Sequence, residues 1–399
     1  VKSEDEVKLT DCNFTDVTGE YKEKFTVEGD KSTCMLKGTK IDEKVEITDG
    51  SLMATALELK EELTVTGSIV SLTDLKAEKE VTIEKSQVVI TGGEFNDKTT
   101  ITSCSARLLS CKFSDDVTIE KGATDSEKNE FEKKLELTGG TIESKRDKFS
   151  DDVTLTDLIA KSLIFEPKEF KKLDIRGKDS SSLLEIIGGT GEDITVDTLG
   201  NLRVFKTTFE KVDLTNVKLC NLVEITATET KVEECGTVIT DDGDLGDTVS
   251  FKLCGTVIAN NTNGQDTTIE DCGQYLGGEA KFQTVTIKKT VLGVTKECSD
   301  LTLEDSALID NGSTIKAVSA QIIGIGSTVE SADTSVINAL DATITCDSSM
   351  VTARGGTVDA GGDSTVTISG GDVMNFGGYT SGTGFNYEDQ GGSTLFDGV

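Results

Sequence analysis

The stretch VTIEKSQVVITGGEFNDK, residues 81–98, contains the pattern that decides the fold. Two apolar residues, Val81 and Ile83, are separated by one polar residue, and the same alternation returns within the stretch. A period of two places both members of such a pair on one face of a β-strand. The alternation predicts three short strands around a narrow core, near residues 81–83, 88–90 and 94–96.

The apolar pair recurs along the chain at a nearly constant step. Its first nine copies are Val7/Leu9, Phe25/Val27, Val45/Ile47, Leu63/Val65, Val81/Ile83, Thr99/Ile101, Val117/Ile119, Leu135/Leu137 and Val153/Leu155. The step is 18 residues, with one step of 20. Later copies begin at Leu173, Ile194, Val212, Thr230, Val249, Thr267, Val285 and Leu301. A strand pattern that returns at a fixed period indicates a solenoid with one coil per repeat.

Two further columns of residues follow the same period. Phenylalanines stand 18 residues apart at Phe95, Phe113, Phe131 and Phe149, and Phe170, Phe209 and Phe282 precede later strands in the same way. The residue before the first strand alternates in charge through Lys98, Asp116, Lys134, Asp152, Lys172, Asp193 and Lys211. Coils stacked in parallel register would bring these side chains about 4.8 Å apart, and opposite charges would then attract. A β-sandwich with charged turns predicts neither column.

These repeats resemble the parallel β-helix class of architecture over nearly all 399 residues, without indicating a specific family. We expect an all-β, right-handed solenoid with three-sided coils of about 18 residues over residues 1–300. From Leu301 the strand positions fall at Ile315, Val329, Thr343 and Val358, so that residues 301–368 should continue the solenoid with smaller coils of about 14 residues. Residues 369–399 should form a C-terminal cap or an assembly segment.

Composition argues against several functions. The chain has no histidine, which removes Ser–His and Cys–His nucleophile pairs, and we therefore expect no enzymatic activity. Its formal charge of −32 argues against binding nucleic acid. No apolar run approaches the ~20 residues that span a bilayer, so we expect no insertion into a membrane.

The cysteines and three glycosylation triplets suggest a secreted, extracellular protein. None of the ten cysteines forms a C-x-x-C pair. Disulfides are favoured among those in one coil, in neighbouring coils or in one column, namely Cys12, Cys34, Cys104, Cys111, Cys235, Cys254 and Cys272; a buried ladder of free thiols is the alternative. The triplets, which are the candidate glycosylation sites, begin at Asn13, Asn260 and Asn311.

One segment offers ligands for a cation. The four aspartates Asp241, Asp242, Asp244 and Asp247 lie on a glycine-containing loop. Carboxylate oxygens on such a loop suit Ca²⁺. An EF-hand would also need a glutamate at loop position twelve, which is absent, and a solvated acidic turn is the simpler interpretation. We therefore expect no cofactor other than, at most, a structural calcium ion.

The C-terminal segment differs in composition from the coils. It contains nine glycines and five of the nineteen aromatic residues, which are Phe376, Tyr379, Phe385, Tyr387 and Phe396. Such a segment could cap its own last coil, or it could dock on an edge strand of a second copy.

The leading hypothesis is a structural protein, a rigid acidic rod that assembles end to end with its own copies into a filament or extracellular matrix. A surface adhesin or glycan-binding spike is the first alternative. A carbohydrate-active enzyme is the second, since parallel β-helices host such enzymes.

Overall fold

The structure is a computed structural model, and its described part is built from strands. The described residues are 2–158, 163–177, 183–277, 280–296, 300–304, 306–311, 314–318, 321–325, 328–332, 336–340, 343–347, 349–354, 357–361, 365–369, 372–375, 379–383, 386–389 and 393–396. They form 51 strands and no helix. It follows that this part of the chain has no helix of the length and hydropathy that crossing a membrane requires.

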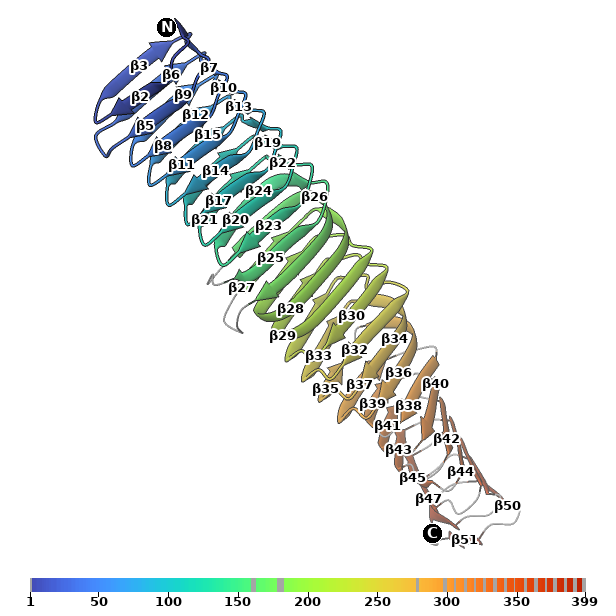
Figure 1. Ribbon diagram of the computed structural model, residues 1–399. Helices are drawn as coiled ribbons and strands as arrows, with labels where there is room; N and C mark the ends of the chain where they lie inside the picture. Colours follow the sequence, from blue (N-terminus) through green and yellow to red (C-terminus); the bar gives the residue numbers. More distant parts are fainter. Residues whose placement is uncertain are drawn as a thin grey trace. The chain divides into compact units, whose positions relative to one another are not determined.

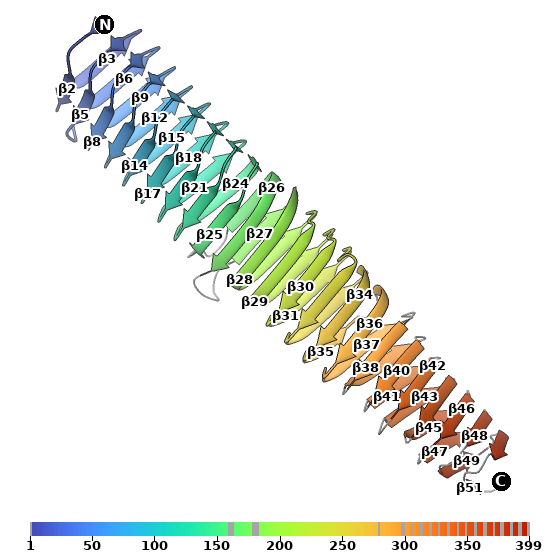
Figure 2. The same cartoon turned by 45° about the vertical axis from the view of Figure 1, so that its right-hand side comes forward.

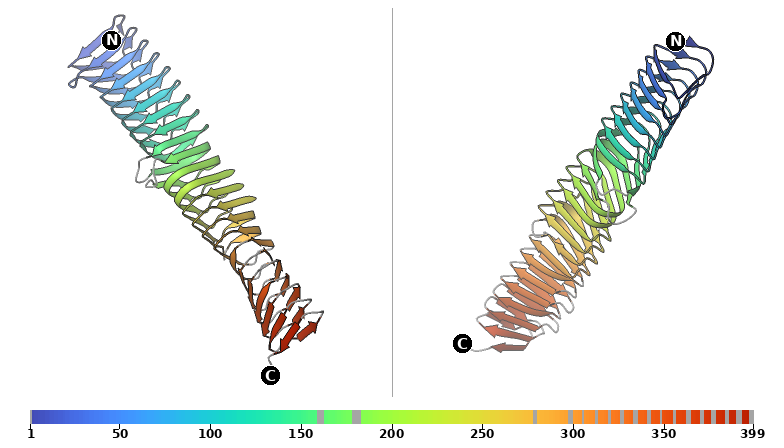
Figure 3. Two further views of the ribbon diagram at one scale, coloured as in Figure 1. Left: turned by 60° about the horizontal axis from the view of Figure 1, so that its bottom comes forward. Right: turned by 90° about the vertical axis from the view of Figure 1, so that its left-hand side faces the viewer.

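The chain divides into two compact units, Val1–Glu210 and Lys211–Val399. In each unit successive coils pair in parallel, so each is a parallel β-solenoid, as the repeat predicts (Figures 1 and 3). The predicted change of coil size lies within the second unit.

Each regular coil of the first unit has three sides. Side 1 consists of β2 (Val7–Thr10), β5 (Phe25–Glu28), β8 (Val45–Thr48), β11 (Leu63–Thr66), β14 (Val81–Glu84), β17 (Thr99–Thr102), β20 (Val117–Glu120), β23 (Leu135–Thr138) and β25 (Val153–Leu158). Side 2 consists of β3 (Asn13–Val17), β6 (Thr33–Lys37), β9 (Ser51–Thr55), β12 (Ile69–Thr73), β15 (Gln87–Thr91), β18 (Ser105–Leu109), β21 (Ala123–Glu127) and β27 (Leu183–Ile187). Side 3 consists of the two-residue strands β1 (Lys2–Ser3), β4 (Glu20–Tyr21), β7 (Lys40–Ile41), β10 (Glu58–Leu59), β13 (Lys76–Ala77), β16 (Glu94–Phe95), β19 (Lys112–Phe113) and β22 (Glu130–Phe131). Longer strands turn a corner and serve two or more sides, namely β24 (Thr141–Phe149), β26 (Leu163–Gly177) and β28 (Thr190–Phe205).

The register of the coils is the one that the 18-residue period predicts. Val81 pairs with Thr99 on side 1, Val88 with Ala106 on side 2, and Phe95 with Phe113 on side 3. Side chains alternate between the core and the surface along each strand, so Val81 is 1% exposed while the neighbouring Thr82 is half-buried. The weak copy at Thr230 also takes its predicted place, between Val212 and Val249.

The corners between sides require a left-handed backbone. Gly92 has a φ of +69°, which glycine adopts without steric cost. The equivalent corners of the neighbouring coils carry non-glycine residues in the same conformation, namely Asp74 with a φ of 52° and Ser110 with a φ of 53°. The stacking of the coils thus imposes a local geometry that the residue type alone does not favour.

The phenylalanines form the predicted ladder in the core. Phe95, Phe113, Phe131 and Phe149 stack with ring centroids 4.6, 4.9 and 5.0 Å apart. Beyond Phe149 the prediction needs a correction, because the next stacked ring is Phe165 from side 2, at 5.2 Å.

Phe170 instead meets Phe209 edge to face, at 5.8 Å, across the coil that contains Gly191. A Cβ atom at Gly191 would lie only 1.9 Å from the ring of Phe170. The missing side chain of Gly191 therefore lets Phe170 reach past one coil to Phe209.

The second unit begins with coils of similar length. Its strands before the change of period are β29 (Lys211–Val223), β30 (Glu229–Glu233), β31 (Thr237–Asp241), β32 (Thr248–Lys252), β33 (Thr256–Asn260), β34 (Asn263–Glu270), β35 (Gln274–Leu276), β36 (Lys281–Lys288) and β37 (Leu292–Lys296). Single bridges of Asp244 with Thr226 and Asn263 replace the short strand of side 3. The predicted position of Phe282 is buried, and Gly264 lies beside its ring.

In the shorter coils the described residues form two sides. Their strands are β38 (Asp300–Glu304), β39 (Ala307–Asn311), β40 (Thr314–Val318), β41 (Gln321–Ile325), β42 (Thr328–Ala332), β43 (Val336–Leu340), β44 (Thr343–Asp347), β45 (Met350–Arg354), β46 (Thr357–Gly361), β47 (Thr365–Ser369), β48 (Asp372–Asn375), β49 (Tyr379–Thr383), β50 (Asn386–Asp389) and β51 (Ser393–Phe396). Each strand pairs with the next but one, so these coils have two strands each.

One predicted core position is wrong by one residue. Val329 pairs with Ile344 and Ile344 pairs with Val358, which makes Ile344 the buried residue and leaves Thr343 exposed. The extra residue of this step thus precedes β44 and does not follow it.

Candidate functional site

The predicted column of alternating charges is present on the first unit. The backbone N–H of Lys134 donates to Asp116 Oδ1 at 3.2 Å. A hydrogen bond to Glu136, and then the charges of Glu136, Asp116 and Asp152, raise the pKa of Lys134. Further along, Lys172 is the register partner of Asp193. Lys134 therefore lies between the two aspartates, as parallel stacking requires.

A second column of alternating charges, on side 3, was not predicted from the sequence. The outward residue of side 3 is, coil after coil, Lys2, Glu20, Lys40, Glu58, Lys76, Glu94, Lys112, Glu130, Lys148 and Glu169. We name this set the side-3 charge ladder. Every neighbouring pair in it has opposite charges, although the residues are 18 to 21 positions apart in the chain.

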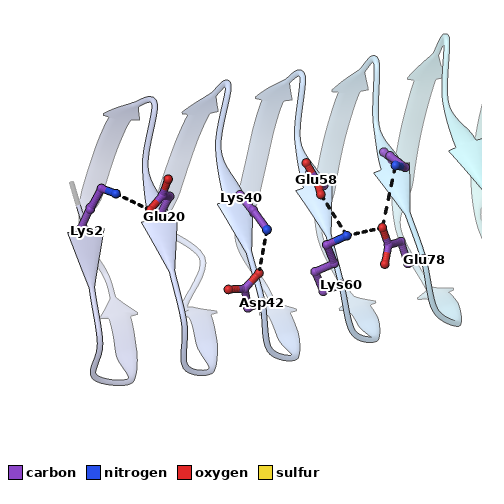
Figure 4. Close-up of polar contacts among 8 residues, drawn as sticks. Lys2, Glu20, Lys40, Asp42, Glu58, Lys60 and Glu78 are labelled. Carbon is purple, nitrogen blue, oxygen red and sulfur yellow. Dashed lines mark hydrogen bonds and ion pairs between the residues drawn. The ribbon is translucent and has the colours of Figure 1, made fainter.

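Ion pairs in this region join residues of neighbouring coils and also residues of the same coil (Figure 4). Lys2 Nζ lies 2.5 Å from Glu20 Oε2 in the next coil, and Lys148 Nζ lies 3.4 Å from Glu169 Oε2. Lys60 lies between Glu58, at 3.1 Å, and Glu78 in the following coil. Hydrogen bonds to Glu78 and Glu58 raise the pKa of Lys60. Two neighbouring pairs of the side-3 charge ladder, Lys2 with Glu20 and Lys148 with Glu169, are thus ion pairs between coils. Other lysines of the ladder pair with acids outside it, as Lys40 does with Asp42 and Lys112 with Glu132.

Buried polar side chains join coils at the corners. The backbone N–H of Gly50 donates to Ser68 Oγ at 3.2 Å, that of Ser68 donates to Ser86 Oγ at 3.1 Å, and that of Ser86 lies 3.4 Å from Cys104 Sγ. Each side chain in this series satisfies a backbone donor of the coil before it, which a buried corner would otherwise leave unpaired.

A second corner series ends on a buried acid. The backbone N–H of Cys111 donates to Asn129 Oδ1, and that of Asn129 donates to Asp147 Oδ1, both at 2.7 Å. Asp147 is fully buried, and its Oδ2 accepts a hydrogen bond from Ser144 Oγ at 2.7 Å. Burial raises the pKa of the Asp147 carboxyl despite these donors. In the next coil its register partner is Pro167, which has no N–H to offer.

The cysteines chosen as disulfide candidates are free thiols, so the structure corrects that expectation. Cys12, Cys34, Cys104, Cys111, Cys235, Cys254 and Cys272 are all unpaired. Stacking in register does bring thiols together: Cys254 forms thiol hydrogen bonds with Cys235 and Cys272. The hydrogen bond with Cys235 and burial raise the pKa of Cys254 to about 11, against the opposite effect of the hydrogen bond with Cys272. Burial raises the pKa of Cys220, which the sequence analysis did not select. The alternative of a buried thiol ladder describes this column.

Two of the four aspartates proposed for calcium, Asp242 and Asp247, accept hydrogen bonds from side chains of the next coil. Asn261 Nδ2 donates to Asp242 Oδ1 at 2.6 Å, and Gln265 donates to Asp247. Asp244 Oδ1 accepts the backbone N–H of Gly246 at 3.2 Å. Among the described residues, no group of three or more Asp, Glu, Cys or His side chains could hold a metal ion. This finding includes Asp241 and the other three aspartates.

The candidate glycosylation sites lie in three different surroundings. Asn13 is exposed on β3, and Asn260 is half-buried at the end of β33. The hydroxyl of Thr262, the third residue of that triplet, is buried and donates to the carbonyl of Asn260 at 2.8 Å. Asn311 ends β39, and its side chain lies outside the described part.

The C-terminal segment continues the two-stranded coils. β48 pairs with β50, and β49 pairs with β51, in parallel and 14 residues apart. The candidate assembly residues Tyr379, Tyr387 and Phe396 lie on β49, β50 and β51, of which only the backbone is described. Phe376 and Phe385 lie outside the described residues.

By architecture, then, the chain is a parallel β-solenoid. No family model, no curated protein and no solved structure matches it. Its role therefore has to be argued from its own surfaces.

Proposed function

We propose that this protein is a structural, self-assembling solenoid, an extracellular scaffold in which copies join end to end. The observation that carries the proposal is the side-3 charge ladder, in which Lys2 through Glu169 alternate in charge. A binding or catalytic protein gathers its polar groups in one cleft. In the first unit charged, polar and aromatic groups are instead spread over successive coils, and many of them connect one coil to the next.

The overall charge sets the conditions for assembly. At −32 the copies repel one another at low ionic strength. Salt shortens the range of this repulsion to about 10 Å at 0.1 M and about 3 Å at 1 M. We therefore expect assembly to increase with salt or with divalent cations.

Electron microscopy of the purified chain, with and without about 1 M NaCl or Ca²⁺, tests the proposal. Particles that lengthen by end-to-end contacts support it. Separate monomers at high concentration in every condition overturn it.

A glycan-binding protein is the competing proposal. It is favoured by a shallow hollow in the second unit, lined by acidic and amide side chains that include Asp242, Asp244, Asn261 and Asn263. Such groups bind sugar hydroxyls by hydrogen bonds. Saturable binding of the monomer on a glycan array, lost in Asp242→Ala, would favour this function over the structural one.

A further inference from the structure

One face of the first unit is almost free of charge. It consists of the outward residues of β3, β6, β9, β12 and β15, which lie side by side on side 2 (Figure 2). These residues are Asn13, Thr15, Val17, Thr33, Met35, Lys37, Ser51, Met53, Thr55, Ile69, Ser71, Thr73, Gln87, Val89 and Thr91. We name this set the neutral face. Lys37 is its one charged member.

Large apolar side chains are exposed on this face. Val17 is 56% exposed, Met35 43%, Met53 44%, Ile69 58% and Val89 42%. Register pairing places Met35, Met53 and Val89 in one central column, with Ser71 between the last two. A shallow depression runs along the same strands and is lined by Met35, Met53 and Ser71 among others. Clustered exposed apolar side chains of this kind indicate a contact surface.

The other sides of the same coils are charged. Side 3 carries the charge ladder, and side 1 carries outward acids and lysines such as Glu28, Glu46 and Lys24. The neutral face ends at β18 and β21, where Arg107 and Asp125 form an ion pair at 3.3 Å. Within these five coils of the first unit the neutral face thus carries a single charged residue, Lys37, although the chain has a net charge of −32.

We propose that the neutral face binds the neutral face of a second copy of this chain. The argument for a second copy is electrostatic. Two acidic chains repel most where their charged surfaces meet, and least where both surfaces are neutral. A partner of opposite charge would be attracted to the acidic surfaces instead and would gain nothing from this face.

The size of the face predicts a weak contact. Five strands at about 4.8 Å, each about 16 Å long, cover roughly 400 Å² per copy. A standard stable interface buries about 800 Å² per partner. A contact of this size is a transient dimer between isolated copies and becomes strong only when many are made along an assembled polymer. The inference rests on the proposed self-assembly, but it locates a lateral contact, distinct from the end-to-end one.

A two-fold axis gives this contact a central residue. In an isologous pair the same surface meets itself. We place the axis along β9, the middle strand of the face. Met53 of one copy then faces Met53 of the other, and Met35 of one copy faces Ser71 of the other. Lys37 then meets Thr73, so that no like charges oppose each other.

Sedimentation velocity over a range of concentrations, in about 1 M NaCl, measures the contact. We expect the wild type to associate reversibly, and Met53→Glu to weaken the association by at least about tenfold, because two glutamates would face each other. Thr64→Glu is the matched control, since Thr64 is the outward residue of β11 on side 1; it should associate as the wild type does. Equal association of wild type and Met53→Glu overturns the proposal, as does a monomeric wild type.

Oxidative cross-linking gives an independent measure. Met53→Cys should form a disulfide-linked dimer under air with a copper catalyst, where two thiols lose two electrons and two protons to O₂. Thr64→Cys should not. Electron microscopy separates this inference from the proposed function: filaments formed by Met53→Glu would leave end-to-end assembly intact while the lateral contact is lost. Wild-type lateral dimers without any filaments would overturn the proposed function alone.

Discussion

The carboxylate of Asp147, which is fully buried, accepts a hydrogen bond from the backbone N–H of Asn129 in the preceding coil, at 2.7 Å. Asn129 itself holds the equivalent corner one coil earlier, where its Nδ2 donates to Ser126 Oγ at 2.9 Å. Ser144 stands three residues before Asp147, as Ser126 does before Asn129. The corner at Asp147 is therefore already shaped for an asparagine.

We predict that Asp147→Asn stabilises the first unit at neutral pH, by about 1 kcal/mol. Burial raises the pKa of the Asp147 carboxyl above its ordinary value of 3.8. The folded chain then keeps this proton to a higher pH than the unfolded chain does, so the contribution of Asp147 to the free energy of unfolding falls as the pH rises through the raised pKa. The advantage of the variant should grow from pH 4 towards pH 7.

Urea unfolding at a series of pH values measures this effect. Asp30→Asn, on an exposed turn between β5 and β6, is the matched control and should leave the pH dependence as it is. If the free energies of unfolding of wild type and Asp147→Asn differ by the same amount at every pH, then ionisation of the Asp147 carboxyl does not cause the difference.

The phenylalanine ladder should dominate the stability of its coils. Phe113 stacks between Phe95 and Phe131 at 4.6 and 4.9 Å and is 1% exposed. Phe113→Ala should lower the free energy of unfolding by about 3–5 kcal/mol, since it removes a buried ring from two stacked pairs and leaves a cavity. Chemical denaturation followed by circular dichroism measures this loss.

A smaller change tests the contribution of stacking itself. Phe113→Leu keeps most of the apolar volume and should cost about 1–2 kcal/mol. Equal losses for leucine and alanine would mean that ring stacking, and not filled volume, accounts for the whole effect.

The side-3 charge ladder should respond to the sign of a single residue. Lys112 has Glu94 and Glu130 as register partners, and its Nζ lies 2.9 Å from Glu132 Oε1. Lys112→Glu places three acids in line and should lower the thermal midpoint more than Lys112→Gln does. About half or more of the difference between these two variants should disappear at 1 M NaCl, where the screening length is about 3 Å. A difference that salt leaves unchanged would rule out a charge effect.

The strand pattern and its period could be predicted from the sequence because each depends on residues close in the chain. The alternation of Val81 and Ile83 defines one strand, and an 18-residue step then places every equivalent residue. Thr343 was predicted one position away from the buried Ile344, because a 15-residue step can place its extra residue at either end. Residues 331–335, before β43, are small or polar, and such a segment does not show where one extra residue has been added.

The polar contacts were harder to predict. The column through Lys134 was found because it directly precedes an apolar pair, whereas Lys112 lies within a two-residue strand, which is too short to show an alternation. Asp147 lies among charged residues in the sequence, and only the corner geometry buries it. The disulfides were predicted from spacing alone, and the same spacing equally suits a column of free thiols.

The thiol column gives a prediction about reactivity. Cys235, Cys254 and Cys272 of this column are buried, as is Cys220 on β29. The hydrogen bond with Cys235 and burial raise the pKa of Cys254 to about 11. Iodoacetamide at pH 8 should leave these four thiols unmodified in the folded protein and should modify them fully in denaturant, because only an accessible thiolate reacts. Mass spectrometry of intact protein measures both. A mass lower by two hydrogens for each pair, with no reaction in denaturant, would instead show disulfides.

End-to-end assembly should depend on the segment after Ile368. Within the described residues, β50 and β51 each pair with one strand only, β48 and β49. An edge strand with free N–H and C=O groups can take up another chain in register, and the aromatic residues of this segment add apolar surface to that contact.

Deletion of residues 369–399 leaves the coils up to β46 with their own pairing, so the truncated chain should fold and yet form no filaments under electron microscopy. Replacement of Tyr379, Tyr387 and Phe396 by serine in the full chain is the matched test, which keeps the backbone edge and removes the aromatic side chains. If truncated chains polymerise as the full chain does, then end-to-end contacts lie elsewhere; if only the serine variant polymerises, the backbone edge alone is sufficient.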